Sequence, residues 1–156
     1  MKLAHTAIRV PDIDAAVAWY ESMLGLRVLS LPYLMDGDSI ARDMGELLPE
    51  PAAVKAAILG NEEGDHVLEI IEYPRVSSGE ATRVFTDNGL SHIGLICDDV
   101  DAMRHTLEAK GVEFITSQVA DIAGLRTAWL RDPWGVVFIL VEKRKRPERA
   151  YWRQYD

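Results

Sequence analysis

One eleven-residue pattern occurs twice in this chain of 156 residues, and this repeat limits the possible folds more than any other feature. Residues 4–14 read AHTAIRVPDID, and residues 91–101 read SHIGLICDDVD. A shift of 87 positions superposes His5 on His92 and Asp12 on Asp99. Because an internal repeat of this length usually corresponds to a repeated structural unit, we expect a single domain built from two similar modules. Their expected bounds are 1–73 and 90–142, with a linker at 74–89 and a tail at 143–156.

The local periodicity predicts the same order of elements in both modules. Residues 3–10 alternate as a strand does, and His5 points away from the larger apolar side chains. Asp12 is a suitable N-cap for a helix that carries Ile13, Val17, Tyr20 and Leu24 on one face and ends at Gly25. Later strands of the first module are expected at 26–31, 52–59 and 66–73. The second module is expected to contain a strand at 90–97, a helix at 99–110 and strands at 112–116, 125–130 and 136–142.

This order predicts the α+β class, with two βαβββ modules that together form a cupped mixed sheet. In each module the helix covers one face of its sheet and leaves the other face open. The segment 36–48 has no counterpart in the second module, and its apolar residues Ile40, Met44, Leu47 and Leu48 are typical of a short helix. We expect this insert to form a flap over the open side, because loops of this kind often shape a binding site.

Composition and charge exclude several classes of function. A net charge of −8 and a pI near 5.0 argue against a nucleic-acid partner, since neutralising phosphates requires a basic face. The sequence has no apolar run long enough to span a membrane and no signal-peptide pattern, so we expect a cytoplasmic protein without a membrane partner. Cys97 occupies an alternating apolar position and is expected to be buried rather than nucleophilic.

Three side chains are candidate metal ligands. His5 and His92 occupy equivalent positions of the repeat, each on the strand face opposite the helix, and imidazole is a common metal ligand. Glu69 lies among apolar residues in Val67–Ile71, where a buried carboxylate is costly unless it is paired or bound to a cation. Glu72 has the opposite strand parity and is expected on the other face.

Five segments together give the chain its resemblance to a known family. They are AHTAIRVPD at 4–12, Trp19-Tyr20 with Leu24-Gly25, LEIIEY at 68–73, SHIGL at 91–95 and RDPWG at 131–135. With them the chain resembles the vicinal oxygen chelate superfamily, which includes glyoxalase I, methylmalonyl-CoA epimerase, extradiol dioxygenases and bleomycin resistance proteins. The resemblance implies paired βαβββ modules that hold a divalent metal ion (Fe, Mn, Ni, Co or Zn), to which a small substrate binds through neighbouring oxygens.

The resemblance also assigns positions to the ligands. His5, Glu69 and His92 match three of them, but Ile139 stands where complete sites of the family place a glutamate. Glu142 is the nearest carboxylate, and its strand parity places it on the helix side unless a bulge turns it.

Two functions from different classes follow. The first is a metal-dependent lyase, isomerase, epimerase or dioxygenase, with Glu69 as the catalytic base and Asp43 or Glu46 of the insert as alternatives. The second is a metal-free protein that sequesters a small molecule, as bleomycin resistance proteins do. In either case Tyr33, Trp129 and Ile139 are expected to contact the ligand, and Met35 and Trp134 are further candidates for lining the cup. We also expect a homodimer, because the family commonly pairs modules across subunits and Tyr151–Tyr155 offers aromatic and basic groups for an interface.

Overall fold

Two compact units make up the chain, residues 1–80 and 81–156. The computed structural model describes residues 4–61, 67–77, 79, 86, 88–122 and 125–142. The basic and aromatic tail that we associate with a dimer interface lies outside these residues. No helix in the described part of the chain is long and apolar enough to cross a membrane.

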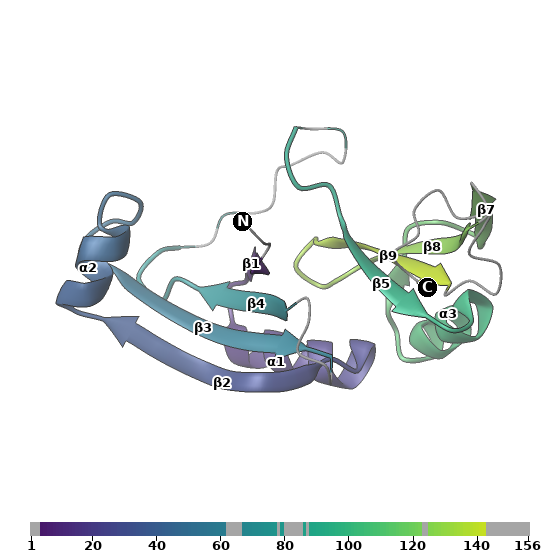
Figure 1. Ribbon diagram of the computed structural model, residues 1–156, viewed down its shortest axis with the longest axis horizontal. Helices are drawn as coiled ribbons and strands as arrows, with labels where there is room; N and C mark the ends of the chain where they lie inside the picture. The colour runs from purple at the N-terminus through teal and green to yellow at the C-terminus, as the bar shows by residue number, and fades with distance from the viewer. Residues whose placement is uncertain are drawn as a thin grey trace. The chain divides into compact units, whose positions relative to one another are not determined.

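The first unit is a four-stranded sheet with one helix on each face (Figure 1). Its strands are ordered β1-β4-β3-β2; β1 runs parallel to β4, and the other pairs are antiparallel. The elements are β1 (His5–Arg9), α1 (Ile13–Leu24), β2 (Arg27–Asp36), α2 (Asp38–Met44), β3 (Ala53–Gly60) and β4 (Val67–Glu72).

Helix α1 forms where the sequence predicts it and packs on the sheet through the predicted stripe. Ile13, Val17 and Tyr20 are buried, and Ala16 joins them. Burying each of the three large side chains contributes about 1.5–3 kcal/mol. Gly25 ends the helix with φ at 68°, a left-handed conformation that glycine adopts without steric cost.

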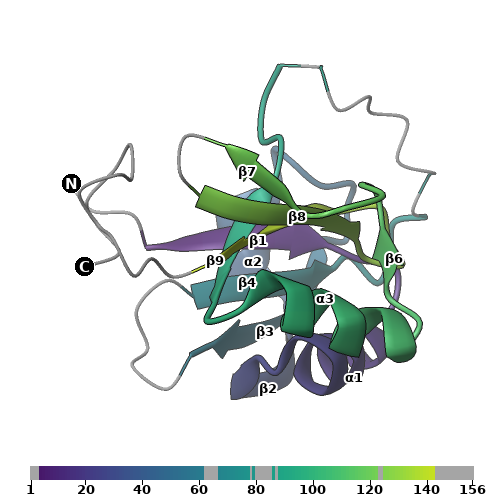
Figure 2. The same cartoon turned by 90° about the vertical axis from the view of Figure 1, so that its right-hand side faces the viewer.

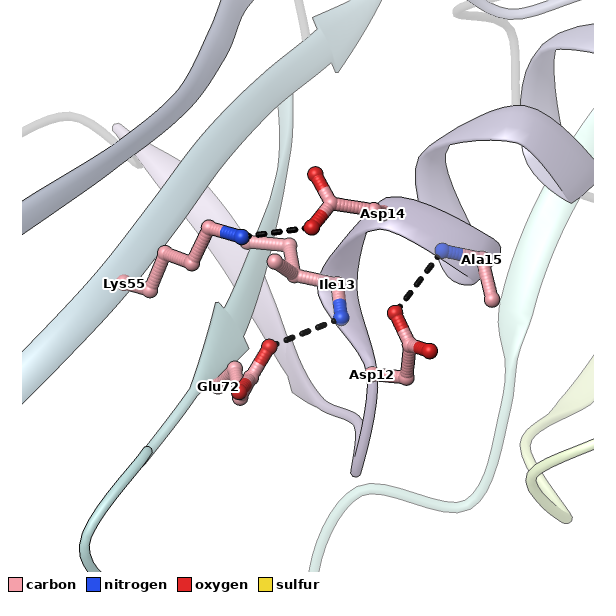
Figure 3. Close-up of polar contacts among 6 residues, drawn as sticks. All are labelled: Asp12, Ile13, Asp14, Ala15, Lys55 and Glu72. Atoms are coloured by element: carbon pink, nitrogen blue, oxygen red, sulfur yellow. Dashed lines mark hydrogen bonds and ion pairs between the residues drawn. The ribbon is translucent and has the colours of Figure 1, made fainter.

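Three polar contacts hold the start of α1, and two of them join it to the sheet (Figure 3). The Asp12 carboxylate accepts the Ala15 N–H at 3.0 Å, and Glu72 of β4 accepts the Ile13 N–H at 3.0 Å. Lys55 of β3 lies 2.6 Å from the Asp14 carboxylate, and this hydrogen bond raises the pKa of the Lys55 ammonium. Asp12 and Glu72 thus satisfy backbone N–H groups that have no partner within the helix.

The second unit repeats this topology around a five-stranded sheet. Its elements are β5 (Ile93–Cys97), α3 (Val100–Ala109), β6 (Glu113–Phe114), β7 (Ala120–Ile122), β8 (Leu125–Arg131) and β9 (Val137–Glu142). The order is β5-β9-β8-β6, with β5 parallel to β9. Strands β6 and β7 pair with opposite ends of β8 (Figure 2), so together they take the place of β2. The α+β class and the βαβββ order of each module are confirmed; the cup that the modules form together stays a prediction.

The repeat extends from the sequence to the contacts at the start of the helix. Glu142 of β9 accepts the Val100 N–H at 3.3 Å, as Glu72 does for Ile13, and Val100 lies 87 positions after Ile13. Arg126 of β8 pairs with Asp101 at 2.5 Å, as Lys55 does with Asp14. Both modules therefore hold the start of their helix with three carboxylates, of which two accept backbone N–H groups and the third pairs with a cation.

Several predicted bounds were wrong. Strand β2 runs to Asp36 instead of residue 31, because an edge strand tolerates Pro32 next to its register shifts. Helix α2 is correspondingly shorter than the predicted segment 36–48, and the predicted strand 112–116 keeps only Glu113–Phe114. Met103 of α3 has the helical spacing of the buried Val100 and Leu107, but it is 39% exposed.

Cys97 is buried, as predicted. Burial, with the nearby Glu142 carboxylate as a smaller cause, raises the pKa of its thiol to about 11. The reactive thiolate is therefore scarce near neutral pH, which agrees with a packing role.

Candidate functional site

The face of the first sheet that points away from α1 carries the candidate ligands of the first module. His5 and Ala7 of β1 are in register with Val67 and Glu69 of β4, and such partners share a face. Glu72 points the other way, toward α1, as predicted. We call this surface, marked by His5 and Glu69, the Glu69 face.

On this face His5 and Glu69 form a close pair. His5 Nε2 lies 3.1 Å from Glu69 Oε2, and the two side chains are 49% and 20% exposed. Nitrogen and oxygen ligands bind a divalent transition metal at about 2.1 Å, so two ligands at right angles are about 3.0 Å apart. The 3.1 Å separation is that of a hydrogen bond or ion pair, and it is also the spacing of two adjacent ligands of one ion, so these two residues are compatible with the metal that the resemblance implies.

Helix α2 covers part of the Glu69 face. Its Ile40 is buried with Ala52, Val54 and Ala56, and Met35, Met44, Leu48, Ile71 and Tyr73 pack against this group. Ala56 and Ile71 are direct partners across β3 and β4, and Ile71 alternates with Glu69. Figure 1 shows α2 and α1 on opposite sides of the sheet. The insert thus lies on the side that the flap prediction requires, and it is anchored there by apolar contacts.

Tyr33 also lies on the Glu69 face. It is the direct partner of Ala56 across β2 and β3, and its side chain is 64% exposed. Asp43 and Glu46, the alternative bases, are exposed residues of α2 and of the turn after it.

In the second unit, His92 lies just before β5 and is half-buried. Its Nδ1 is 2.7 Å from the Ser91 hydroxyl oxygen, and its ring packs edge-on against Trp129, with 4.8 Å between centroids and 72° between planes. Trp129 pairs with Ile139, and Ile139 pairs with Gly94. Three predicted residues, His92, Trp129 and Ile139, therefore lie together on one face, called here the Trp129 face.

The strand register shows which residue of the first module corresponds to Ile139. Glu69 is the partner of Ala7, Ile139 is the partner of Gly94, and Ala7 and Gly94 are 87 positions apart. Ile139 is thus the counterpart of Glu69 in the repeat. Glu142 lies on the α3 side, where it accepts the Val100 N–H and lies 3.5 Å from the Arg126 guanidinium. The parity prediction for Glu142 is confirmed.

The structure does not test the full ligand set. His5 and Glu69 belong to the first unit and His92 to the second, so their convergence on one ion stays a prediction. Among the described residues of each unit, no three histidine, cysteine, aspartate or glutamate side chains lie close enough to hold a metal ion by themselves.

Two polar residues that the sequence did not single out as site candidates lie beside the candidate ligands. Arg9 lies on the Glu69 face with its guanidinium carbon 5.2 Å from the centre of the Tyr73 ring, and it donates to the Val76 and Ser77 carbonyls at 3.4 Å. Because Arg9 is four residues after His5 in a strand, the alternation of side chains already indicated that both lie on the same face. Ser91 contacts His92. In the sequence, the only feature that distinguishes Ser91 is that it stands where the first repeat has Ala4.

Comparison with known proteins identifies the family of this chain. Residues 2–140 match the model of the Glyoxalase/Bleomycin resistance protein/Dioxygenase superfamily, and the chain belongs to this superfamily.

Individual relatives carry more specific names. A 2-epi-5-epi-valiolone epimerase from Actinomyces is 29% identical over 143 residues, which cover 88% of this chain and 76% of that protein. A probable chloroplastic lactoylglutathione lyase from Arabidopsis thaliana is 26% identical over 94% of this chain and 37% of its own length. A crystal structure of a glyoxalase family protein from Bacillus cereus matches with a TM-score of 0.76 at 20% identity, over 91% of this chain and 93% of that one. This last likeness supports the fold alone.

Proposed function

We propose that this protein is a divalent-metal-dependent enzyme of the isomerase, epimerase or lyase type that acts on a small substrate with two neighbouring oxygens. The single observation that carries the proposal is the His5–Glu69 pair, with 3.1 Å between Nε2 and Oε2 on the face away from α1. The names of the epimerase and lyase relatives support the reaction type. Their reactions suit a site that moves a proton next to a carbonyl.

Each residue has a definite role in this proposal. His5, Glu69 and His92 hold the metal, which supplies Lewis-acid polarisation of a substrate oxygen when it is bound. In this proposal Glu69 also accepts and returns the proton, because its side chain, 20% exposed, can be reached by a small substrate. The cluster around Ile40 shields one end of the Glu69 face from water.

The apolar residues would contact the rest of the substrate. Tyr33 presents a largely exposed ring on the Glu69 face. Trp129 and Ile139 present a half-buried apolar surface on the Trp129 face. We propose that these three side chains contact the carbon skeleton, while the oxygens face the ligands.

Metal binding by the purified protein tests the proposal. Calorimetry with Mn, Ni, Co, Zn and Fe(II) should show one site per chain, and His5→Ala and Glu69→Gln should each weaken it at least about 10-fold, since each removes a ligand. His105→Ala is the matched control, because His105 is an exposed histidine of α3 on the other unit. A wild-type protein that binds none of these ions, or a Glu69→Gln protein that binds them normally, would contradict the proposal.

A metal-free binding protein is the second candidate, and the Trp129 face favours it. There an isoleucine replaces the carboxylate, and the His92 ring packs against an indole, which gives a surface suited to apolar ligands. Elemental analysis of protein purified without chelator or affinity metal separates the two functions. The absence of bound metal, together with ligand affinity that EDTA leaves unchanged, would favour the binding protein.

A further inference from the structure

We propose that Ser30 is a specificity-determining residue of the Glu69 face, where its hydroxyl binds an oxygen at the far end of the substrate. The inference rests on the proposed function and narrows the substrate class. Besides two neighbouring oxygens at one end, the substrate carries a hydroxyl or carbonyl oxygen a few carbons away. The inference begins from two irregularities in the pairing of β2 with β3, one on each side of Ser30.

The register decides the face on which Ser30 lies. Ser30 and Tyr33 are three residues apart, so in a regular strand they would point to opposite faces. Their partners on β3, Ile58 and Ala56, are two residues apart and share one face. The two register shifts that flank Ser30 therefore bring both side chains of β2 to the Glu69 face. Bulges of this kind re-aim side chains and are over-represented at sheet edges and next to active sites.

Ser30 and Glu69 belong to one row of side chains across the sheet. Ile58 of β3 is the direct partner of Ser30 on one side and of Glu69 on the other, and Ala7 of β1 continues the row. Neighbouring strands are about 4.8 Å apart, so Ser30 and Glu69 are separated by about 10 Å along the row. A substrate whose neighbouring oxygens lie beside Glu69 can therefore extend over Ile58 and reach Ser30 with its other end.

Apolar groups border this row on both sides. Toward α2, Tyr33 follows Ser30 on the same face, and the cluster around Ile40 covers the sheet beyond it. Toward the opposite end, Leu29 lies against Gly60, where an added Cβ would be 3.0 Å from Leu29 Cδ1. These borders favour a compact carbon skeleton whose polar end points along the row to Ser30.

The Ser30 hydroxyl is available to a ligand. Ser30 is exposed, and its Oγ lies 3.4 Å from the Leu31 carbonyl oxygen, which is longer than the roughly 2.5–3.0 Å of a well-formed O–H···O bond. A substrate oxygen can replace this long contact with a shorter one. Because a hydroxyl both donates and accepts hydrogen bonds and carries no charge, it suits a neutral hydroxyl or carbonyl group.

Calorimetry of the zinc-loaded full chain with two matched chelators tests the inference. Butanohydroxamic acid and 4-hydroxybutanohydroxamic acid share a chelating head of two neighbouring oxygens and differ only in the terminal hydroxyl. The wild type should bind the hydroxylated compound about 3- to 10-fold more tightly, which is the effect of one hydrogen bond. Ser30→Ala should remove this preference, and Ser30→Thr should keep it because threonine retains the hydroxyl. Ser117→Ala, which changes an exposed serine of the second unit, is the control and should also keep it.

The affinities for zinc and for butanohydroxamic acid separate a substrate contact from a structural role. Ser30→Ala should leave both affinities unchanged, since the variant is expected to lose only the contact with the terminal hydroxyl. A wild type without the preference, a Ser30→Ala protein that keeps it, or a Ser30→Ala protein that loses zinc binding would overturn the role of Ser30 and leave the proposed function standing. A wild-type chain that binds no metal would overturn both.

Discussion

Ile139 occupies in the second unit the position that Glu69 occupies in the first, and this one residue separates the two modules chemically. On the Glu69 face, a carboxylate lies next to His5. On the Trp129 face, an isoleucine lies between Gly94 and Trp129, near the ring of His92. A metal held by three protein ligands keeps open positions for water or substrate, so the substitution predicts a weak site with room for a chelating ligand.

Restoring the carboxylate should strengthen the site. Ile139→Glu is expected to tighten binding of Mn, Ni, Zn or Fe(II) by roughly 10- to 100-fold, because a direct ligand should matter at least as much as a group that only supports one. Calorimetry and thermal melts with and without metal measure the effect. The control Ile96→Glu places a carboxylate on a 50%-exposed residue of β5, two positions after Gly94, and should not tighten binding.

The metal-free alternative makes the opposite prediction for the same variant. A glutamate at 139 would then be a partly buried charge without a counter-ion and should cost several kcal/mol of unfolding free energy. An Ile139→Glu protein that is destabilised and indifferent to every metal would exclude the metalloenzyme.

At the scale of the element, strand β4 has two glutamates with different tasks. Glu69 and Glu72 are three residues apart and therefore point to opposite faces. Glu72 accepts the Ile13 N–H at the start of α1, and Glu142 repeats this contact at α3. Strand parity thus divides the two glutamates of β4 between helix capping and the candidate site, whereas β9 keeps only the capping glutamate.

This division predicts opposite phenotypes. Glu72→Ala should lower the unfolding free energy by about 1–2 kcal/mol, since it removes a charge-assisted bond to a helix N–H, and should leave metal affinity unchanged. Glu69→Ala should change stability by less than about 0.5 kcal/mol and abolish most metal binding. Urea denaturation and calorimetry of the metal-free and metal-loaded proteins measure both quantities. Equal stability losses in the two variants would refute the assignment.

At the scale of the whole molecule, the two units share one topology but differ in what they add to it. The first unit carries the α2 insert on its Glu69 face, and the second divides its edge strand into β6 and β7. The shared parts support the helix and the strand pairing, while the added parts alter the open face or the sheet edge. This distribution is expected of a duplicated module whose specificity evolved outside the common core.

The assembly prediction also belongs to this scale. We expect a homodimer, so light scattering at high protein concentration should give about twice the chain mass of 17.4 kDa. Removal of residues 143–156 should shift the equilibrium toward the monomer if the tail contributes to the interface, as its aromatic and basic residues suggest. A monomer mass for the full chain at high concentration would be evidence against the dimer.

The sequence alone determined the features that depend on local spacing. The repeat and the alternation of side chains predicted both βαβββ modules, and the aspartate caps predicted where the helices begin. Parity also placed Glu142 on the helix side, because a strand alternates strictly with period two.

Only the tertiary structure decided the features that depend on contacts between distant segments. The length of β2 past Pro32 follows from its edge position beside β3, and β6 and β7 exist because β8 offers them partners at both ends. The 3.1 Å approach of His5 to Glu69 depends on the register of β1 against β4, and the packing of His92 on Trp129 depends on the order β5-β9-β8. Periodicity specifies the face on which a side chain lies, but strand register and three-dimensional packing decide which side chains meet there.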